Sequence, residues 1–170
     1  MSEKLGFLIL RSDKLSKDVA GLWPLVDLVT TLICKDKRIM TVYNDKWGAF
    51  TLPMSKRRQW KDAKLKDEGE RLEEWDDAAV RVAAEWLGCT LTTMPDKLTE
   101  LSEFQQSDRD EKWKRYRVHV YLLNVAATEP APGRIVEWLT PEELLDEHRR
   151  PISPTARFII AELRYKGLLQ

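Results

Sequence analysis

Two apolar segments in the first half of the chain have the pattern of paired β-strands. Residues 26–33 (VDLVTTLI) and 38–43 (RIMTVY) are rich in β-branched side chains and are separated by the stretch Cys-Lys-Asp-Lys. β-Branched residues fit the pleated surface of a sheet, so the two segments predict a hairpin. A further short strand is expected at residues 50–52, where Pro53 ends it.

A helical repeat of apolar positions follows in the sequence LEEWDDAAVRVAAEWLG. Four apolar residues at intervals of four, three and four fall on one stripe of a helix, namely Trp75, Ala79, Val82 and Trp86. The first turn is acidic, which suits the positive end of a helix dipole, and Gly88 is well placed to end the helix. We therefore predict a helix over residues 73–87.

Strands and helices are mixed in the second half of the chain. Residues 98–104 and 115–125 predict strands joined by a polar loop, and IVEWL at residues 135–139 predicts another strand. Thr140 opens the sequence T-P-E-E, a capping pattern with proline at the first helical position. A final helix is expected after the Ser-Pro pair at Ser153. Because the elements do not alternate strictly, the pattern indicates an α+β sandwich with a mixed β-sheet.

Length and charge limit the classes of function. A chain of 170 residues with 43% hydrophobic residues predicts one domain with a sizeable core, over residues 1–170. The 28 basic and 28 acidic residues cancel, which argues against bulk binding of nucleic acid or of a membrane surface. Residues 56–71 are an exception, since seven basic and four acidic residues give this predicted charged loop a local charge of 7 − 4 = +3.

The cysteines and the N-terminal extension point to a reducing compartment. Cys34 and Cys89 form no C-x-x-C pair, so neither a disulfide framework nor a structural zinc site is expected, and we expect Cys89 to be buried. In the extension, residues 1–25, the segment 5–10 (LGFLIL) predicts a short strand and 14–22 a weak helix or a loop. The apolar run is too short for a signal sequence or a membrane span, so we expect a cytoplasmic protein.

The order of these elements, together with one spaced motif, resembles the Nudix hydrolases from about Val26 onward. That family's box reads Gly, five residues, Glu, seven residues, Arg-Glu-apolar, one residue, Glu-Glu, one residue, Gly-apolar. The matching residues here are Glu73, Arg81, Ala83, Glu85 and the pair Gly88-Cys89. The family's Pro-Gly-Gly-Lys turn corresponds to Pro53-Met54-Ser55-Lys56, and the sequence EWLTPEEL agrees near the C-terminus.

The box also departs from the family pattern at three places. Ser55 stands for the box glycine, and 17 residues rather than five separate it from Glu73, which is an insertion of 12 residues. Val82 replaces the glutamate that follows the arginine, and Trp86 replaces the second of the paired glutamates. Only Glu85 remains of three carboxylates that would converge on one helix face.

The resemblance implies an α/β/α sandwich that cleaves a diphosphate linked to another group, usually a nucleoside, with Mg²⁺ or Mn²⁺. It implies that Glu85 would hold the metal and that Glu73 and Arg81 would form an orienting pair. The partner would be a nucleotide-like small molecule, with Lys56 on its phosphate. The neighbouring bases Arg57 and Arg58 suit a phosphate clamp, although a solvated loop is the alternative interpretation.

Three interpretations of positions 82 and 86 stay open. The periodicity favours simple packing of Val82 and Trp86, but the two side chains could instead line an apolar, ligand-binding pocket where the metal once lay. A metal site rebuilt from other acids is the third, with Asp77, Glu103 and Glu129 as the candidates, although Glu103 and Glu129 read as surface acids. His119, in a predicted strand, is expected to be a packed histidine.

Two functions follow from these interpretations. The first is hydrolysis of a nucleoside-diphosphate-linked compound, with metal-dependent activity that is weakened or lost. The second is a non-catalytic ligand-binding or regulatory module on the same fold, for which no metal would be needed. The carboxylate count on the helix favours the second, whereas the family resemblance favours the first.

Overall fold

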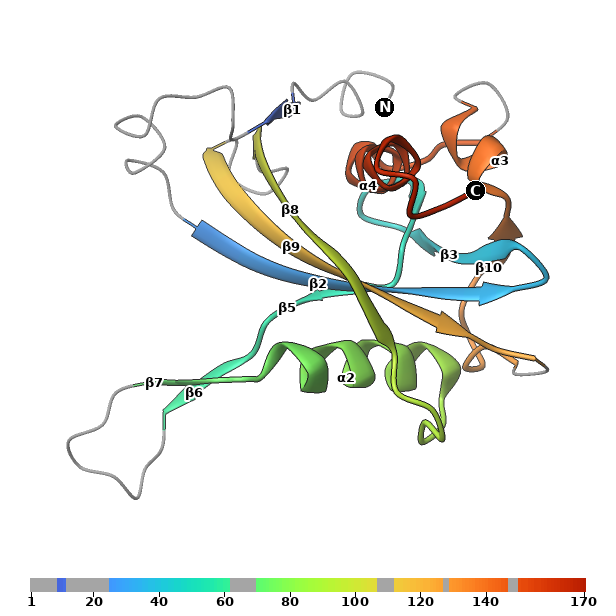
Figure 1. Ribbon diagram of the computed structural model, residues 1–170, viewed down its shortest axis with the longest axis horizontal. Helices are drawn as coiled ribbons and strands as arrows, with labels where there is room; N and C mark the ends of the chain where they lie inside the picture. Colours follow the sequence, from blue (N-terminus) through green and yellow to red (C-terminus); the bar gives the residue numbers. More distant parts are fainter. Residues whose placement is uncertain (1–8, 12–24, 62–69, 107–111, 127–128, 147–149) are drawn as a thin grey trace.

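A mixed β-sheet forms the centre of the computed structural model, which describes residues 9–11, 25–61, 70–106, 112–126, 129–146 and 150–170 (Figure 1). Six of its strands follow the order β1-β8-β9-β2-β3-β10, while β4 pairs with β3 and β5 with β2. These strands are β1 (Ile9–Arg11), β2 (Leu25–Lys35), β3 (Arg38–Asn44), β4 (Ala49–Thr51), β5 (Met54–Lys56), β8 (Asp96–Gln106), β9 (Trp113–Asn124) and β10 (Val136–Leu139). Strands β2 and β9 run parallel, and the other strand pairs named here are antiparallel.

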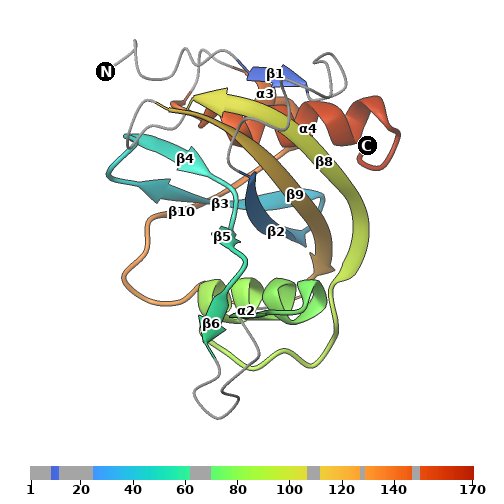
Figure 2. The same cartoon turned by 90° about the vertical axis from the view of Figure 1, so that its left-hand side faces the viewer.

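Helices cover both faces of this sheet (Figures 1 and 2). Helix α2 (Trp75–Leu87) lies on one face, while α3 (Pro141–Leu145) and α4 (Pro154–Tyr165) lie on the other. Strand β9 serves both layers because successive side chains point to opposite faces: Val120 packs in the cluster that holds Ile160 of α4, whereas Tyr121 packs with Val82 of α2. The predicted α+β class and the α/β/α sandwich with a mixed sheet are confirmed.

The hairpin between β2 and β3 is confirmed, with Cys34 opposite Ile39 and Lys35 opposite Arg38. Its turn residues Asp36 and Lys37 both have positive φ, at 49° and 62°, as a tight two-residue hairpin turn requires. The strand expected at residues 50–52 is β4, shifted by one residue.

The helix boundaries follow the signals in the sequence closely. Helix α2 starts at Trp75, two residues later than predicted, and Gly88 ends it in the left-handed conformation with φ of 64°. Thr140 accepts a hydrogen bond from the Glu143 N–H while the Glu143 carboxylate accepts one from the Thr140 N–H, so the predicted capping box is present. Ser153 caps α4 through the Ala156 N–H.

The long strands and the charged insertion differ from the prediction. Strands β8 and β9 extend into the stretch predicted as a polar loop. They pair with each other from Asp96, which lies opposite Leu122, to Gln106, which lies opposite Trp113. The ends of the predicted loop 56–71 form a two-stranded hairpin of β6 (Gln59–Lys61) and β7 (Glu70–Leu72).

Two expectations about the extension meet the structure only in part. The strand expected at residues 5–10 corresponds to β1, which pairs with β8 through Ile9 and Gln105. The segment 14–22 lies outside the described residues. Within the described ranges, no helix is long and apolar enough to cross a membrane.

Candidate functional site

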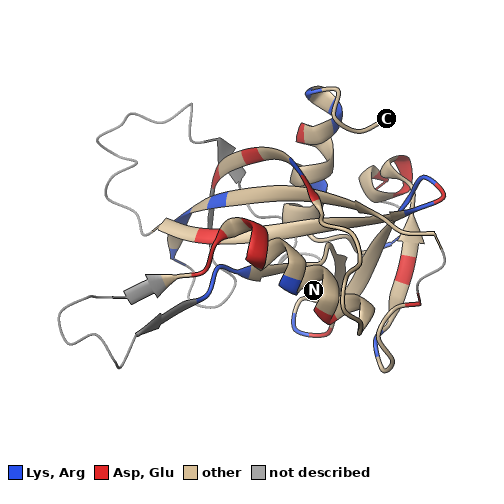
Figure 3. Ribbon diagram, turned by 60° about the horizontal axis from the view of Figure 1, so that its bottom comes forward, with Lys and Arg blue, Asp and Glu red and all other residues tan. Residues whose placement is uncertain are grey.

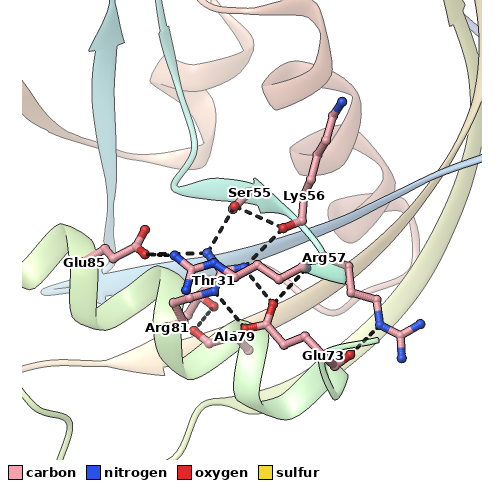
Figure 4. Close-up of polar contacts among 9 residues, drawn as sticks. Thr31, Ser55, Lys56, Arg57, Glu73, Ala79, Arg81 and Glu85 are labelled. Atoms are coloured by element: carbon pink, nitrogen blue, oxygen red, sulfur yellow. Dashed lines mark hydrogen bonds and ion pairs between the residues drawn. The ribbon is translucent and has the colours of Figure 1, made fainter. Parts of the chain in front are cut away.

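The first feature of the site is a buried ion pair at the start of α2 (Figure 4). Arg81 donates two hydrogen bonds of 2.8 Å to the Glu73 carboxylate, from Nε to Oε2 and from Nη2 to Oε1. The Arg58 N–H donates a third, of 3.1 Å, to Oε1. The hydrogen bond from Arg81 is the main reason that the pKa of Glu73 lies below its ordinary value. Glu73 is therefore charged at neutral pH, and both of its carboxylate oxygens accept hydrogen bonds from the protein.

The same arginine ties α2 to strand β5. Its Nη1 donates a hydrogen bond of 3.2 Å to Ser55 Oγ, and its Nη2 donates one of 3.2 Å to the Lys56 carbonyl oxygen. Ser55 stands where the family pattern has glycine, and its hydroxyl supplies an acceptor that glycine lacks. The sequence-predicted residues Glu73 and Arg81 are thus brought together and hold the segment that contains Ser55 and Lys56 against the helix.

Glu85, the single carboxylate left on the expected metal-binding face, is paired with two guanidinium groups. Its Oε1 lies 3.3 Å from Arg58 Nη2 and 3.6 Å from Arg81 Nη1. The Arg58 side chain is 58% exposed and that of Glu85 is 45% exposed, whereas Arg81 is 14% exposed. Figure 3 shows the basic segment after β5 lying alongside α2, whose first turn is acidic. The remaining carboxylate therefore faces cations of the protein itself.

The two positions that lack carboxylates belong to apolar contacts. Val82 is fully buried and packs with Val29, Ala79 and Tyr121. Trp86 is half-buried against two core clusters, and the Arg134 guanidinium carbon lies 3.9 Å from its ring centroid. The packing interpretation is confirmed for Val82.

A small pocket lies beside Trp86, where the sequence left an apolar cavity as one interpretation. Its volume is about 180 Å³, and its lining mixes apolar and charged residues: Val42, Tyr43, Asp45, Trp86, Gly133, Arg134 and Ile135. The loop that carries Arg134 is fixed to the helix, since the Ala131 N–H donates a hydrogen bond to the Trp86 carbonyl oxygen. Trp86 therefore both packs and borders a pocket.

These residues do not fit the divalent cation that the family resemblance implies. Mg²⁺ and Mn²⁺ prefer several oxygen ligands, and α2 offers one carboxylate here, already held by two arginines. Across the described part of the chain, no three His, Cys, Asp or Glu side chains group as a metal site would need. Asp77 and Glu129 are exposed. Nothing in the described donor set replaces the carboxylates missing at positions 82 and 86.

The basic residues at the end of β5 and directly after it have different surroundings. Lys56 is exposed, and its side chain points away from the Arg81 network in Figure 4. Arg57 is turned inward, because its Nε donates a hydrogen bond to the Glu73 carbonyl oxygen, its Nη1 lies 3.5 Å from Asp27 Oδ2 and its guanidinium lies 4.5 Å from the Trp75 ring centroid. Of the predicted basic trio, Arg58 alone faces Glu85.

A second cluster, at the start of α2, was only partly anticipated. The Trp75 and His119 rings stack with centroids 3.5 Å apart and planes 4° apart. Arg117 donates two hydrogen bonds, of 2.9 and 3.0 Å, to the Asp27 carboxylate beside them. Burial lowers the pKa of His119, although Glu100 3.2 Å away acts in the opposite sense. His119 is the packed histidine that was predicted, but its stacking partner had no signal beyond strand and helix periodicity.

Two predictions about burial are wrong. Glu103 is not a surface acid: it is fully buried on the sheet face that carries Leu101, and neither carboxylate oxygen has a hydrogen-bond partner among the described residues. Burial raises its pKa to about 8. Cys89 is exposed rather than buried, because the left-handed turn at Gly88 directs the chain away from the core. Burial raises the pKa of the other cysteine, Cys34, to about 11.

Solved structures provide the comparison with known proteins, since neither a family model nor a curated protein matches this sequence. The MutT protein of Methanosarcina mazei Go1 is 18% identical, with a TM-score of 0.59 over 86% of this chain and 97% of that one. The MutT Nudix hydrolase of Burkholderia pseudomallei is 20% identical, with a TM-score of 0.56 over 82% and 98%.

A third similar structure is the Nudix domain of Shewanella oneidensis NrtR in complex with ADP ribose. It is 14% identical, with a TM-score of 0.52 over 91% of this chain and 95% of that one. Identities this low extend the likeness to the fold alone. The sandwich, the helix that carries Glu85 and the coverage of nearly whole Nudix structures together show that this chain has a Nudix-like fold.

Proposed function

We propose that this protein binds a nucleoside-diphosphate-linked compound and hydrolyses it weakly or not at all with a divalent metal. The Nudix-like fold supports the ligand class, since one similar structure contains ADP ribose. A cytoplasmic location and a small-molecule partner, with no bulk binding of nucleic acid and no membrane attachment, are part of the proposal. The ligand would be a soluble compound that binds at the surface formed by α2 and β5.

The observation that carries this proposal is the pair of substitutions at Val82 and Trp86. Metal-assisted cleavage needs a cation that polarises the phosphate and helps to activate a water molecule. With Val82 inside the core and Trp86 under Arg134, Glu85 would have to anchor the cation without a neighbouring carboxylate. A single carboxylate cannot both hold the cation and leave a base for water.

Residue roles follow from the positions around α2. Glu73 and Arg81 would orient the segment after β5, and any residual Mg²⁺ or Mn²⁺ would bind at Glu85. The substrate contacts would be Lys56, Arg58 and, after a change of its present partners, Arg57. Trp86 would border the part of the ligand that enters its pocket.

The second candidate is a purely non-catalytic binding or regulatory module. The specific observation that favours it is the occupation of Glu85 by Arg58 and Arg81. In that case the protein would recognise its ligand and no divalent metal would be needed. The two candidates differ only in whether slow turnover accompanies binding.

A turnover assay with a matched variant tests the proposal. Purified protein is incubated with ADP ribose or with ADP in the presence of MgCl₂ or MnCl₂ at about 5 mM, an excess chosen to fill a weak metal site. The products are then separated by chromatography. We expect the turnover rate to be about 100-fold or more below that of an intact Nudix hydrolase assayed in parallel. The reason is that several kcal/mol of transition-state charge stabilisation by the metal would be missing. Robust turnover that Glu85→Gln abolishes would overturn the proposal.

A further inference from the structure

The convergence of two guanidinium groups on one oxygen atom of Glu85 is the starting point. Arg58 Nη2 and Arg81 Nη1 lie 3.3 Å and 3.6 Å from Glu85 Oε1. Arg81 belongs to α2, whereas Arg58 lies between β5 and β6. Guanidinium groups arranged in this way bind carboxylate and phosphate oxygens alike. The Oε1 atom therefore lies where an oxygen of a bound phosphate would find both donors.

Arg81 and the Arg58 backbone are held in place, whereas the Glu85 side chain and the 58% exposed Arg58 side chain are not. Arg81 is held by its two hydrogen bonds to Glu73 and by Ser55, and the Arg58 backbone is held by its N–H on Glu73. Glu85 has no such support: its carboxylate is 45% exposed, and among the described residues its polar contacts are these two arginines. Exposed ion pairs of this kind are weak and exchange readily.

The charge around the pair favours an anion as the ligand. Once Glu85 moves out, the two positive charges of Arg58 and Arg81 are balanced by the one negative charge of Glu73, with which Arg81 is paired. Arg57 does not add to this excess, since Asp27 pairs with it. A diphosphate group supplies the negative charge that this excess requires.

We propose that Glu85 is the resident counter-ion of a metal-independent anion site, and that a diphosphate group displaces it to bind Arg58 and Arg81. This inference rests on the proposed function and adds the mode of binding. Arginine donors take the place that a divalent cation has in the resembled hydrolases. Glu85 then competes with the ligand instead of contributing to its binding.

The sign of one substitution separates this proposal from a metal site. If Glu85 competes with the diphosphate, Glu85→Gln removes a like charge, so ADP binding should become about threefold tighter or more. If Glu85 holds a metal that bridges to the ligand, the same variant should weaken binding. Arg58→Ala should weaken binding about tenfold, because a charge-assisted contact is lost. The affinity of Arg58→Lys for ADP should lie between that of the parent protein and that of Arg58→Ala, since lysine keeps the charge without the planar donor pair.

Isothermal titration of ADP and of inorganic diphosphate into the full chain, in EDTA and then in MgCl₂, measures these effects. We expect the affinity in EDTA to match or exceed that in MgCl₂ and to fall as salt is added. Arg38→Ala is the control, because this exposed arginine lies on β3 and pairs with Glu143 of α3, away from the site. Thermal melts verify that each variant is folded.

Binding that requires Mg²⁺, or that Glu85→Gln weakens, would overturn the counter-ion role. An Arg58→Ala affinity equal to that of Arg38→Ala would also overturn it. The proposed function fails by a different result, namely efficient metal-dependent turnover in the hydrolysis assay. Metal-dependent binding without turnover would thus exclude the counter-ion role and leave the proposed function in place.

Discussion

Glu73 and Arg81 form a two-pronged ion pair in which both hydrogen bonds measure 2.8 Å and both side chains are largely buried. Glu73 precedes α2 and Arg81 lies in its middle, eight residues later, so the pair links the chain before the helix to the helix itself. Strand β5 is attached to Arg81 through Ser55 and Lys56, and the segment after it is attached to Glu73 through the Arg58 N–H. Breaking this pair affects both the helix start and the candidate site.

Arg81→Ala should therefore destabilise the protein strongly. The substitution leaves a charged Glu73 carboxylate, only 8% exposed, without its partner, which costs about 3 kcal/mol or more of unfolding free energy. Urea denaturation followed by circular dichroism measures the loss. In the exposed pair of Arg38 and Glu143, Arg38→Ala should cost less than about 1 kcal/mol. Equal losses in the two variants would contradict the structural role of Arg81.

Glu73 should also make stability fall in acid. Its pKa is lowered in the folded state, chiefly by the hydrogen bond from Arg81, so the folded protein binds this proton less readily than the unfolded chain. Its contribution is complete above the ordinary value of 4.5 and is lost as the pH falls through the lowered pKa. Below pH 4.5, the unfolding free energy of the parent protein should fall more steeply than that of Glu73→Gln. Parallel curves would exclude this linkage.

Glu103 should have the opposite pH dependence. Burial raises its pKa from 4.5 to about 8, so the folded state holds this proton more tightly than the unfolded chain does. Its stabilising contribution is complete below pH 4.5 and is lost as the pH rises towards 8. Glu103→Gln cannot ionise, so its stability relative to the parent should increase over this range by an amount on the order of several kcal/mol. Thermal melts at pH 5 and pH 8, roughly the ends of the window, measure it; a constant difference would contradict the prediction.

Restoring the two missing carboxylates should have unequal costs. Val82→Glu places a charged group in the fully buried cluster of Val29, Ala79 and Tyr121, which should cost several kcal/mol, about the penalty for an unpaired buried charge. Trp86→Glu loses ring packing, but its carboxylate can reach solvent and the Arg134 guanidinium that now lies over the ring. Differential scanning fluorimetry should show the larger decrease in melting temperature for Val82→Glu. The reverse order would mean that position 82 can open to solvent.

Gly88 and Gly133 form a matched pair that separates backbone strain from a close contact. Both have positive φ, at 64° and 81°, so alanine is strained at either position by about 1 kcal/mol. At Gly88 a new Cβ would also lie 3.2 Å from the Ala131 Cβ, whereas at Gly133 it meets no atom of the described residues within 4 Å. Gly88→Ala should therefore be the more destabilising in urea denaturation. Equal effects would show that the loop at Ala131 moves away without cost.

Local order in this protein could be predicted because it depends on neighbours in the sequence. Three features depend only on hydrogen bonds between backbone or side-chain groups a few residues apart. They are the turn of the β2–β3 hairpin, the T-P-E-E box at Thr140 and the helix end at Gly88. The apolar stripe that contains Val82 likewise predicted which face of α2 is buried. The sequence also contained both members of the Glu73–Arg81 pair, through the spacing of the family motif.

Tertiary structure alone decided what each of these faces meets. Alternation along β8 places Glu103 on the same face as Leu101, but only the packed sheet shows that its carboxylate is buried with no hydrogen-bond partner in the described part of the chain. Cys89 follows an apolar helix and is nevertheless exposed, because the chain leaves the core at Gly88. Periodicity reports the direction of a side chain, whereas burial depends on which distant segment covers it.

The character of the candidate site was decided in the same way. The family resemblance implied three carboxylates where the sequence has one, and the basic loop was visible in the sequence as a local excess of charge. The pairing of Arg58 with Glu85 joins residues 27 positions apart, and no local pattern specifies it. It arises because the Glu73–Arg81 pair and strand β5 hold the basic segment against α2. Long-range contacts of this kind determine which charges neutralise one another, and therefore what remains for a ligand to bind.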